Sequence, residues 1–273
     1  MNKIITFEDI LLSGKELDRI RRELYHSSGP GFIIFREFVR RQIADHIVEY
    51  WVRQAKPEVS HTRIKPKNPF YPGCPAYFAG SLEGSRTYYN PFWGPIFDVA
   101  TNEVSLAISQ LRAKIEGKAF GREIFPYPGG KCTVPRVVIT RSGKTIVPPH
   151  SDYGMDEPDP ANVDLARLQA TLYLSEHQKD YNGSGFVFTR NDGKQVCFAR
   201  DEKLVSGDLV LWRYPNQHEV RDISVVGDQI GFVRMLFPPE KIGAPQKMGR
   251  KLSLRSLVPA PMKRIIKKAI GVK

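Results

Sequence analysis

The chain has 273 residues, a formal net charge of +12, and a composition that is 41% hydrophobic and 11% aromatic. These values predict one large globular domain with a well-buried core, and they exclude a disordered or fibrous chain. No stretch approaches the roughly 18 consecutive apolar residues of a membrane span, and the N-terminal residues lack the features of a signal peptide. The three cysteines are far apart in the sequence. This spacing fits neither a disulfide framework nor a thiolate metal site, so we expect a cytoplasmic protein.

The positive charge is concentrated near the C-terminus. Residues 241–273 contain ten Lys and Arg residues and no Asp or Glu, and subtracting these ten from +12 leaves only +2 for residues 1–240. We therefore expect a single domain over 1–240, whose small charge argues against a nucleic-acid partner, and a basic tail over 241–273. In the tail, residues 262–270 predict a short amphipathic helix, which fits peripheral contact with an anionic membrane or an acidic partner such as a carrier protein. A solvated helix packed on the domain fits the same pattern.

The N-terminal part predicts two helices around a strand. Ser13 and Glu16 have the spacing of a capping box, because each side chain can bond the other residue's free backbone amide, and they predict a helix over 14–26. The apolar run 32–35 predicts a buried strand. Apolar residues at four-residue spacing predict a second amphipathic helix over 38–53.

Residues 56–94 are rich in Pro, Gly and aromatic residues and predict a long irregular segment. Such a segment can cover a substrate, or its aromatic side chains can close one end of the core. A long helix is predicted over 95–116. Residues 153–165, which hold several acidic side chains, form either a solvated loop or a cover that favours a cationic group.

From residue 134 onward the pattern changes to short strands separated by glycine-containing turns. Helices followed by many strands are typical of an α+β protein, in which an antiparallel sheet system has its helices packed on one side. The predicted strands span residues 137–140, 168–174, 186–188, 195–198, 208–212 and 230–237.

Two short segments carry candidate metal ligands. His150 and Asp152 are two residues apart, so in an extended segment both side chains point to the same face. His218 follows the predicted strand 208–212 and a turn. If the intervening strands bring the two segments together, two imidazoles and one carboxylate can bind one face of a metal. This is the ligand set of non-haem iron(II) oxygenases.

These motifs and their flanking strands resemble the Fe(II)/2-oxoglutarate-dependent oxygenases, in their phytanoyl-CoA-hydroxylase-like and prolyl-hydroxylase-like branches. The similarity runs from about residue 31 to 239. It implies a double-stranded β-helix, or jelly roll, over about 134–239. It also implies that His150, Asp152 and His218 bind Fe(II), with 2-oxoglutarate and O2 as co-substrates and succinate and CO2 as products. The related halogenases lack the carboxylate ligand, so Asp152 argues against halogenation.

The resemblance also implies a cation for the distal carboxylate of 2-oxoglutarate, and arginine matches a carboxylate best. Relatives commonly place this residue roughly ten positions after the second histidine, where this chain has Asp228 and Gln229. We predict Arg234 instead, supported by the hydroxyl group of Tyr173. If Gln229 faces inward, Arg234 should face outward unless a bulge intervenes. The reserve candidates are Arg136, Arg167 and Gln169.

The principal hypothesis is a hydroxylase that acts on an aliphatic C–H of a small molecule, such as a biosynthetic intermediate or a lipid- or carrier-linked one. Two alternatives remain open at this point. The net charge suggests an oxidative demethylase of nucleic acid. The missing conventional arginine suggests a non-catalytic binding protein on the same scaffold.

Overall fold

The structure is a computed structural model that describes residues 12–54, 77–78, 85–92, 98–125, 131–143, 147–152 and 164–241. The predicted amphipathic helix over 262–270 and most of the acidic segment 153–165 lie outside these residues. Among the helices in the described ranges, none is long and apolar enough to cross a membrane.

A main sheet of seven antiparallel strands forms the centre of the molecule, in the order β1-β12-β8-β15-β5-β3-β2. Most neighbours in this order are far apart in the sequence, so the sheet joins the N-terminal and C-terminal parts of the domain. Its strands are β1 (Phe32–Phe35), β2 (Tyr77–Phe78), β3 (Ser85–Tyr89), β5 (Arg136–Thr140), β8 (Leu168–Tyr173), β12 (Leu209–Arg213) and β15 (Phe232–Leu236).

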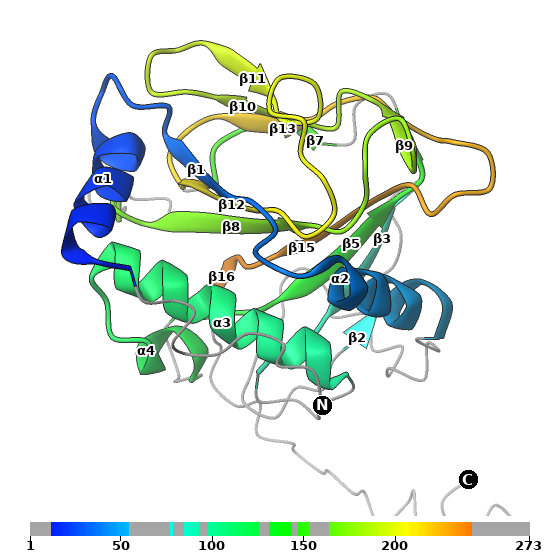
Figure 1. Ribbon diagram of the computed structural model, residues 1–273, viewed down its shortest axis with the longest axis horizontal. Coiled ribbons are helices and arrows are strands. Elements are labelled where there is room, and N and C mark those ends of the chain that lie inside the picture. Colours follow the sequence, from blue (N-terminus) through cyan, green and yellow to red (C-terminus); the bar gives the residue numbers. More distant parts are fainter. Residues whose placement is uncertain are drawn as a thin grey trace, which may run out of the picture.

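A four-stranded sheet with the order β11-β10-β13-β7 faces one side of the main sheet (Figure 1). Two smaller sheets, β6-β14-β9 and β16-β4, complete the strands of the described ranges. The four-stranded sheet contains β7 (Val147–His150), β10 (Phe186–Thr189), β11 (Gln195–Cys197) and β13 (His218–Val220). The smaller sheets contain β4 (Lys131–Thr133), β6 (Ser142–Gly143), β9 (Tyr181–Gly183), β14 (Ile223–Val225) and β16 (Pro239–Lys241).

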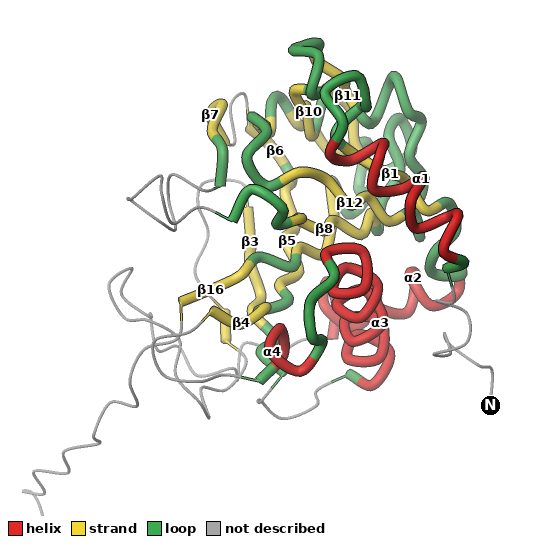
Figure 2. Tube along the Cα trace, turned by 90° about the vertical axis from the view of Figure 1, so that its left-hand side faces the viewer, coloured by secondary structure: helices red, strands yellow, loops and turns green. Residues whose placement is uncertain are grey.

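The helices cover the opposite face of the main sheet, as Figures 1 and 2 show. They are α1 (Gly14–Tyr25), α2 (Arg41–Val48), which continues as a π-helix over Glu49–Gln54, α3 (Val99–Glu116) and the short α4 (Gly121–Ile124). Two facing antiparallel sheets with helices on one side confirm the predicted α+β jelly-roll architecture. The main sheet also takes β1, β2 and β3 from before residue 134, so the core is larger than the predicted range.

The two faces of the main sheet have different chemistry because successive side chains of a strand point to opposite sides. On β8, Leu168, Ala170 and Leu172 belong to the apolar cluster that the helices cover. The alternate residues Gln169, Thr171 and Tyr173 point into the space between the two sheets. The inner face of β8 is therefore polar although every residue of the strand is buried.

The capping box of α1 is confirmed. The Ser13 amide donates to Glu16 Oε2 at 2.9 Å, and the Glu16 amide donates to Ser13 Oγ at 3.3 Å. Strand β1 has the predicted bounds of 32–35. Both elements follow from local signals, namely a cap and a short apolar run between turns.

Three predicted elements differ from the structure, and two of them are helices. The helix expected over 38–53 begins at Arg41, because the N-cap residue Arg40 has an extended ψ of 141°, and it changes to a π-helix at Glu49. The long helix begins at Val99 and not at residue 95, since Asp98 caps it by accepting from the Thr101 amide at 2.8 Å.

The third difference is that the segment expected to be irregular over 56–94 contains β3, which pairs with β5 along its whole length. Its sequence, Ser-Arg-Thr-Tyr-Tyr, carries no strong alternation of apolar residues. The partner strand supplies the backbone hydrogen bonds, so this strand is decided by tertiary structure.

We predict that Gly207→Ala destabilises the fold strongly. Gly207 has a φ of +100°, and an added Cβ would lie 2.2 Å from the Val39 carbonyl oxygen. Backbone strain of about 1–3 kcal/mol and steric overlap of about 1–3 kcal/mol should both reduce the free energy of unfolding in urea. The matched control is Gly193→Ala, at φ +83° with nothing within 4 Å, which should show the strain alone. Equal losses in the two variants would contradict the packing argument.

Candidate metal centre

The pairing of β7 with β13 brings the two candidate histidines together. The strands are antiparallel, and His218 lies directly opposite His150 in the register. The centroids of the two imidazole rings are 4.2 Å apart. Asp152 follows β7 after one intervening residue, so the chain returns its carboxylate toward the same point.

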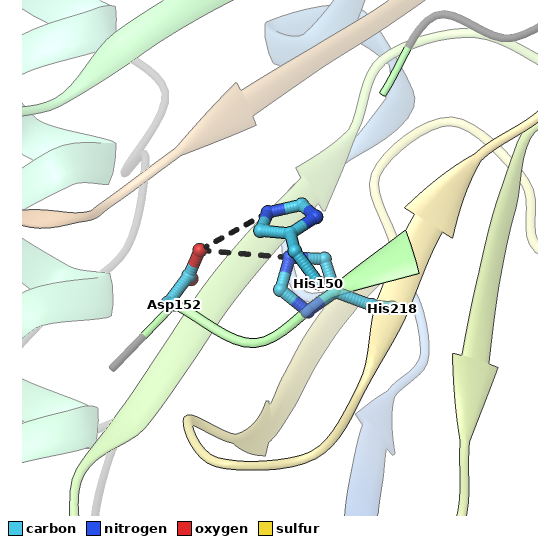
Figure 3. Close-up of side chains that lie close together, drawn as sticks. All are labelled: His150, Asp152 and His218. Atoms are coloured by element: carbon cyan, nitrogen blue, oxygen red, sulfur yellow. Dashed lines mark ion pairs between the residues drawn. The ribbon is translucent and has the colours of Figure 1, made fainter. Parts of the chain in front are cut away.

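The three side chains converge, as Figure 3 shows. Oδ1 of Asp152 lies 3.5 Å from Nε2 of His150 and 3.6 Å from Nε2 of His218. One candidate ligand atom from each residue lies within 4.8 Å of the others. In the described part of the chain, this is the group of His, Cys, Asp and Glu side chains with the geometry to hold a metal ion.

The hydrogen bonds of the two imidazoles set their tautomers. Nδ1 of His150 is 2.8 Å from the Pro148 carbonyl, and Nδ1 of His218 is 3.3 Å from the Asn216 carbonyl. A carbonyl oxygen only accepts, so each Nδ1 carries a proton and donates it. When the ring is neutral, each Nε2 therefore carries the lone pair that a metal ligand must have, whereas a protonated His150 donates from Nε2 to Asp152.

Gln169 orients the carboxylate. Its Nε2 donates to Asp152 Oδ2 at 2.6 Å, which leaves Oδ1 directed at the two histidines. From the sequence, Gln169 was only a reserve candidate for binding the co-substrate, and this positioning role was missed. The sequence does carry a signal for this role. Gln169, Thr171 and Tyr173 alternate with apolar residues along β8, and this alternation predicts a polar inner face.

The protonation of the three groups follows from burial and contact. Desolvation lowers the pKa of His218 to about 4, so its ring is neutral at pH 7. The hydrogen bond to Asp152 raises the pKa of His150. Burial raises the pKa of Asp152, but the hydrogen bond from His150 and the charges nearby outweigh it and leave that pKa below its ordinary value. Asp152 is therefore ionised, and a metal ion would compete with the proton for His150.

The three side chains open into a cavity of about 230 Å³ between the two sheets. Phe186 and Trp212 enclose His218, with ring centroids 5.5 Å and 4.4 Å from its imidazole. The indole of Trp212 donates to Thr171 Oγ1 at 3.2 Å, which fixes its position. The lining residues are Arg136, Val147, His150, Asp152, Gln169, Ala170, Phe186, Trp212, His218, Val220, Arg234, Leu236 and Pro238.

Arg234 lies in this cavity and is 4% exposed. Burial lowers its pKa to about 10, so the guanidinium is still charged at neutral pH. Its Cζ lies 4.9 Å from the ring centroid of Phe232. Within the described ranges no carboxylate pairs with Arg234, and its Nε has no hydrogen-bond partner. A buried cation without an anion is costly, which makes the site suited to an anionic ligand.

Tyr173 lies opposite Arg234 in the pairing of β8 with β15. Its hydroxyl is fully buried and has no partner in the described part of the chain. Burial raises its pKa well above the ordinary value, so the hydroxyl is neutral and can donate. Gln229 lies before β15 and is exposed. Gln229 does not face inward, so its separation from Arg234 does not turn Arg234 outward. Arg234 lines the cavity and therefore faces inward.

The donor set fits a divalent transition metal. Two neutral imidazole nitrogens and one carboxylate oxygen on the same side of a common point are the ligands of a facial site, and the remaining positions face the cavity. All three residues were predicted from the sequence. Arg234 and Tyr173 were also predicted, and the structure places these two side by side deeper in the domain. Of the three reserve residues, Arg136 and Gln169 line the cavity, whereas Arg167 is not among its lining residues, and neither is Tyr173.

Comparisons with known proteins support the architecture. No protein-family model matches the chain, and no curated protein matches it in sequence. A prolyl-4-hydroxylase from Pseudomonas putida has a similar structure, with a TM-score of 0.50, 16% identity, and coverage of 84% of this chain and 100% of that one. SnoN, a non-haem α-ketoglutarate-dependent epimerase from nogalamycin biosynthesis, also has a TM-score of 0.50, with 9% identity and coverage of 87% and 88%.

This chain has the fold of the 2-oxoglutarate-dependent Fe(II) oxygenases. The fold implied by the sequence resemblance is thereby confirmed. At these identities the likeness concerns the fold, so the chemistry has to be argued from the cavity and its residues.

We predict that Gln169→Leu weakens metal binding without unfolding the domain. Loss of the hydrogen bond to Asp152 frees the carboxylate to rotate, and changes of this kind typically reduce metal affinity by about 10- to 100-fold. Titration with Co(II), followed by its visible absorption, measures the dissociation constant. The control is Gln229→Leu, at an exposed position, which should bind Co(II) as the wild type does. Unchanged affinity in Gln169→Leu would show that Asp152 is held by other contacts.

Proposed function

We propose that this protein is an Fe(II)- and 2-oxoglutarate-dependent oxygenase that hydroxylates an aliphatic C–H of a small molecule. In that reaction 2-oxoglutarate is oxidised and loses CO2, and one oxygen atom of O2 enters the resulting succinate. The other oxygen atom enters the substrate as a hydroxyl group. The oxidation of both molecules supplies the electrons that reduce O2.

One observation carries the proposal. A single cavity holds both a facial set of metal ligands and a buried arginine whose charge no described carboxylate offsets. A metal-ligand set or a buried arginine, taken singly, occurs in proteins of many functions. Together they match a molecule that binds a metal at one end and presents a carboxylate at the other, as 2-oxoglutarate does.

His150, Asp152 and His218 would hold the iron, which supplies the activation of O2 when it is bound. Three protein ligands leave positions for a bidentate co-substrate and for O2. Gln169 keeps Asp152 Oδ1 directed at the metal. Phe186 and Trp212 shield His218 from water on the inner side of the cavity.

Arg234 and Tyr173 would bind the distal carboxylate of 2-oxoglutarate. The guanidinium offers two parallel N–H donors, and the neutral Tyr173 hydroxyl offers a third donor. The absence of an arginine at the usual position had suggested a non-catalytic protein. Arg234 reaches the cavity from β15 instead, which favours the catalytic alternative.

We predict that His150→Ala abolishes cofactor binding. Anaerobic addition of Fe(II) and 2-oxoglutarate to the wild type should produce a weak visible charge-transfer band, because the chelated co-substrate accepts charge from the metal. The variant loses one of three ligands and should show no band and no succinate formation in air. His177→Ala is the control, since neither His177 nor its ring neighbour Tyr181 is among the residues that line the cavity. A wild type without the band and without succinate would contradict the proposed function.

We predict that Arg234→Gln raises the dissociation constant of 2-oxoglutarate by about 10- to 100-fold, the loss expected for a charge-assisted hydrogen bond. The same variant should be at least as stable as the wild type without ligands, because it removes a buried charge that has no described partner. Titration of the charge-transfer band and thermal unfolding measure the two effects. Arg234→Lys should recover only part of the affinity, since lysine keeps the charge but lacks the planar fork. Lost stability with unchanged affinity would assign Arg234 a structural role.

A further inference from the structure

Of the two histidines of the metal centre, His218 has the longer hydrogen bond. Its Nδ1 lies 3.3 Å from the Asn216 carbonyl oxygen. The corresponding distance from His150 to the Pro148 carbonyl oxygen is 2.8 Å. N–H···O bonds in proteins are typically about 2.7–3.2 Å long and weaken beyond that range. The orientation of the His218 ring therefore depends more on the side chains packed against it than on its hydrogen bond.

Trp212 packs on His218 from the main sheet. The two ring centroids are 4.4 Å apart, closer than the 5.5 Å between His218 and Phe186. Trp212 is 3% exposed, and its ring also contacts Phe188, which lies opposite His218 in the pairing of β10 with β13. The indole therefore forms the surface against which the imidazole of this ligand rests.

The indole ring is itself oriented by a hydrogen bond to Thr171. Its Nε1 donates to Thr171 Oγ1 at 3.2 Å, and Thr171 is 1% exposed. Trp212 lies opposite Gln169 in the pairing of β12 with β8, so Thr171, two residues further along β8, is its diagonal neighbour on the same face. An indole has a single polar group, and a buried donor without an acceptor is costly. The hydrogen bond therefore favours the indole orientation that faces His218.

The inner face of β8 thus acts on two of the three candidate ligands. Gln169 bonds Asp152 directly, with its Nε2 donating to Oδ2 at 2.6 Å. Thr171 reaches His218 through the indole of Trp212. Because Thr171 is not among the residues that line the cavity, its effect on a bound metal has to pass through that indole.

We propose that Thr171 is a positioning residue of the metal centre. Through its hydrogen bond to Trp212, it holds the His218 imidazole in the orientation that metal binding requires. Side chains that orient a metal ligand change the affinity for the metal although they do not touch it. This inference rests on the metal site of the proposed function and adds to it a residue outside the ligand set.

The first measurement is the dissociation constant for Co(II) of the full-length protein, from the visible absorption of the bound ion. Thr171→Val keeps the shape of the side chain and removes the hydroxyl. We expect its dissociation constant to rise about three- to tenfold, less than the roughly 10- to 100-fold typical of a direct partner of a metal ligand, because Thr171 acts one contact further away. Thr171→Ser keeps the hydroxyl and should bind Co(II) within about twofold of the wild type.

The second measurement needs no metal. The chain contains three tryptophans, and the indole N–H signal of Trp212 in the nitrogen-15 NMR spectrum of the metal-free protein is the one that Trp212→Phe removes. In Thr171→Val the proton resonance of this signal should shift upfield, because the N–H loses its acceptor. In Thr171→Ser it should stay close to its wild-type position.

A double variant tests the route from Thr171 to the metal. Trp212→Phe removes the indole N–H and should weaken Co(II) binding at least as much as Thr171→Val does. Adding Thr171→Val to Trp212→Phe should change the dissociation constant by less than about twofold, because residues that act through one shared contact are not additive.

The matched control is Thr140→Val. Thr140 is also a fully buried threonine of the main sheet, its Oγ1 lies 2.9 Å from Ser85 Oγ, and it is not among the residues that line the cavity. The control should lower the free energy of unfolding in urea and leave the dissociation constant for Co(II) at the wild-type value. Thr171→Ala, which also removes the hydroxyl, replaces Thr171→Val if the valine variant does not fold.

Several results would overturn the inference. The first is a Thr171→Val or Trp212→Phe variant that binds Co(II) as tightly as the wild type. The second is an equal loss of affinity in Thr140→Val, which would indicate a general effect of removing a buried hydroxyl. The third is a full further loss when Thr171→Val is added to Trp212→Phe, which would indicate a route other than the indole.

The wild type separates this inference from the proposed function. If it binds Co(II) but gives no charge-transfer band with Fe(II) and 2-oxoglutarate, the proposed function is contradicted and the role of Thr171 at the metal centre is still decided by the variants. If it binds no Co(II), the metal centre and this inference are both overturned.

Discussion

The antiparallel pairing of β7 with β13 is the contact on which the rest of the site depends. It sets His218 opposite His150, and the register shifts between His218 and Val220. An irregularity of this kind bends a strand and changes the direction of a side chain. On its other side β13 pairs with β10, where Phe188 lies opposite His218. The histidine is therefore held from both edges of a three-residue strand, which explains how so short an element can define a metal centre.

The two faces of the main sheet have different roles, because successive side chains along each strand point to opposite faces. One face supplies apolar residues to the helices and provides the larger hydrophobic cluster of the domain. The other face places Gln169, Arg136 and Arg234 in the cavity, on three strands that are adjacent in the sheet. Functional side chains on strands backed by a packed helical layer are held more rigidly than side chains on loops. The site thus gains its precision from the burial of the opposite face.

The charged and polar groups in the cavity are better suited to binding a ligand than to stabilising the fold. Asp152 is satisfied by Gln169 and the histidines, but Arg234 Nε and the Tyr173 hydroxyl are buried without described partners. Groups of this kind destabilise a folded protein unless something binds them. Arg234 lines the cavity of the metal ligands, and Tyr173 is its register partner on the neighbouring strand. The buried charge of Arg234 in this cavity is the strongest physical argument for an anionic co-substrate.

The sequence by itself determined the elements that rest on local signals. The capping box at Ser13, the apolar run of β1 and the main strands from residue 136 onward were predicted close to their observed bounds, since caps and side-chain alternation need no distant partner. The ligand triplet was also predicted, because residue type and spacing limit the chemistry. Tertiary structure alone decided that β3 is a strand, that Arg234 faces inward, and that Gln169 holds Asp152. Each of these depends on the register between strands far apart in the chain, and register is set by packing and backbone pairing that no local pattern encodes.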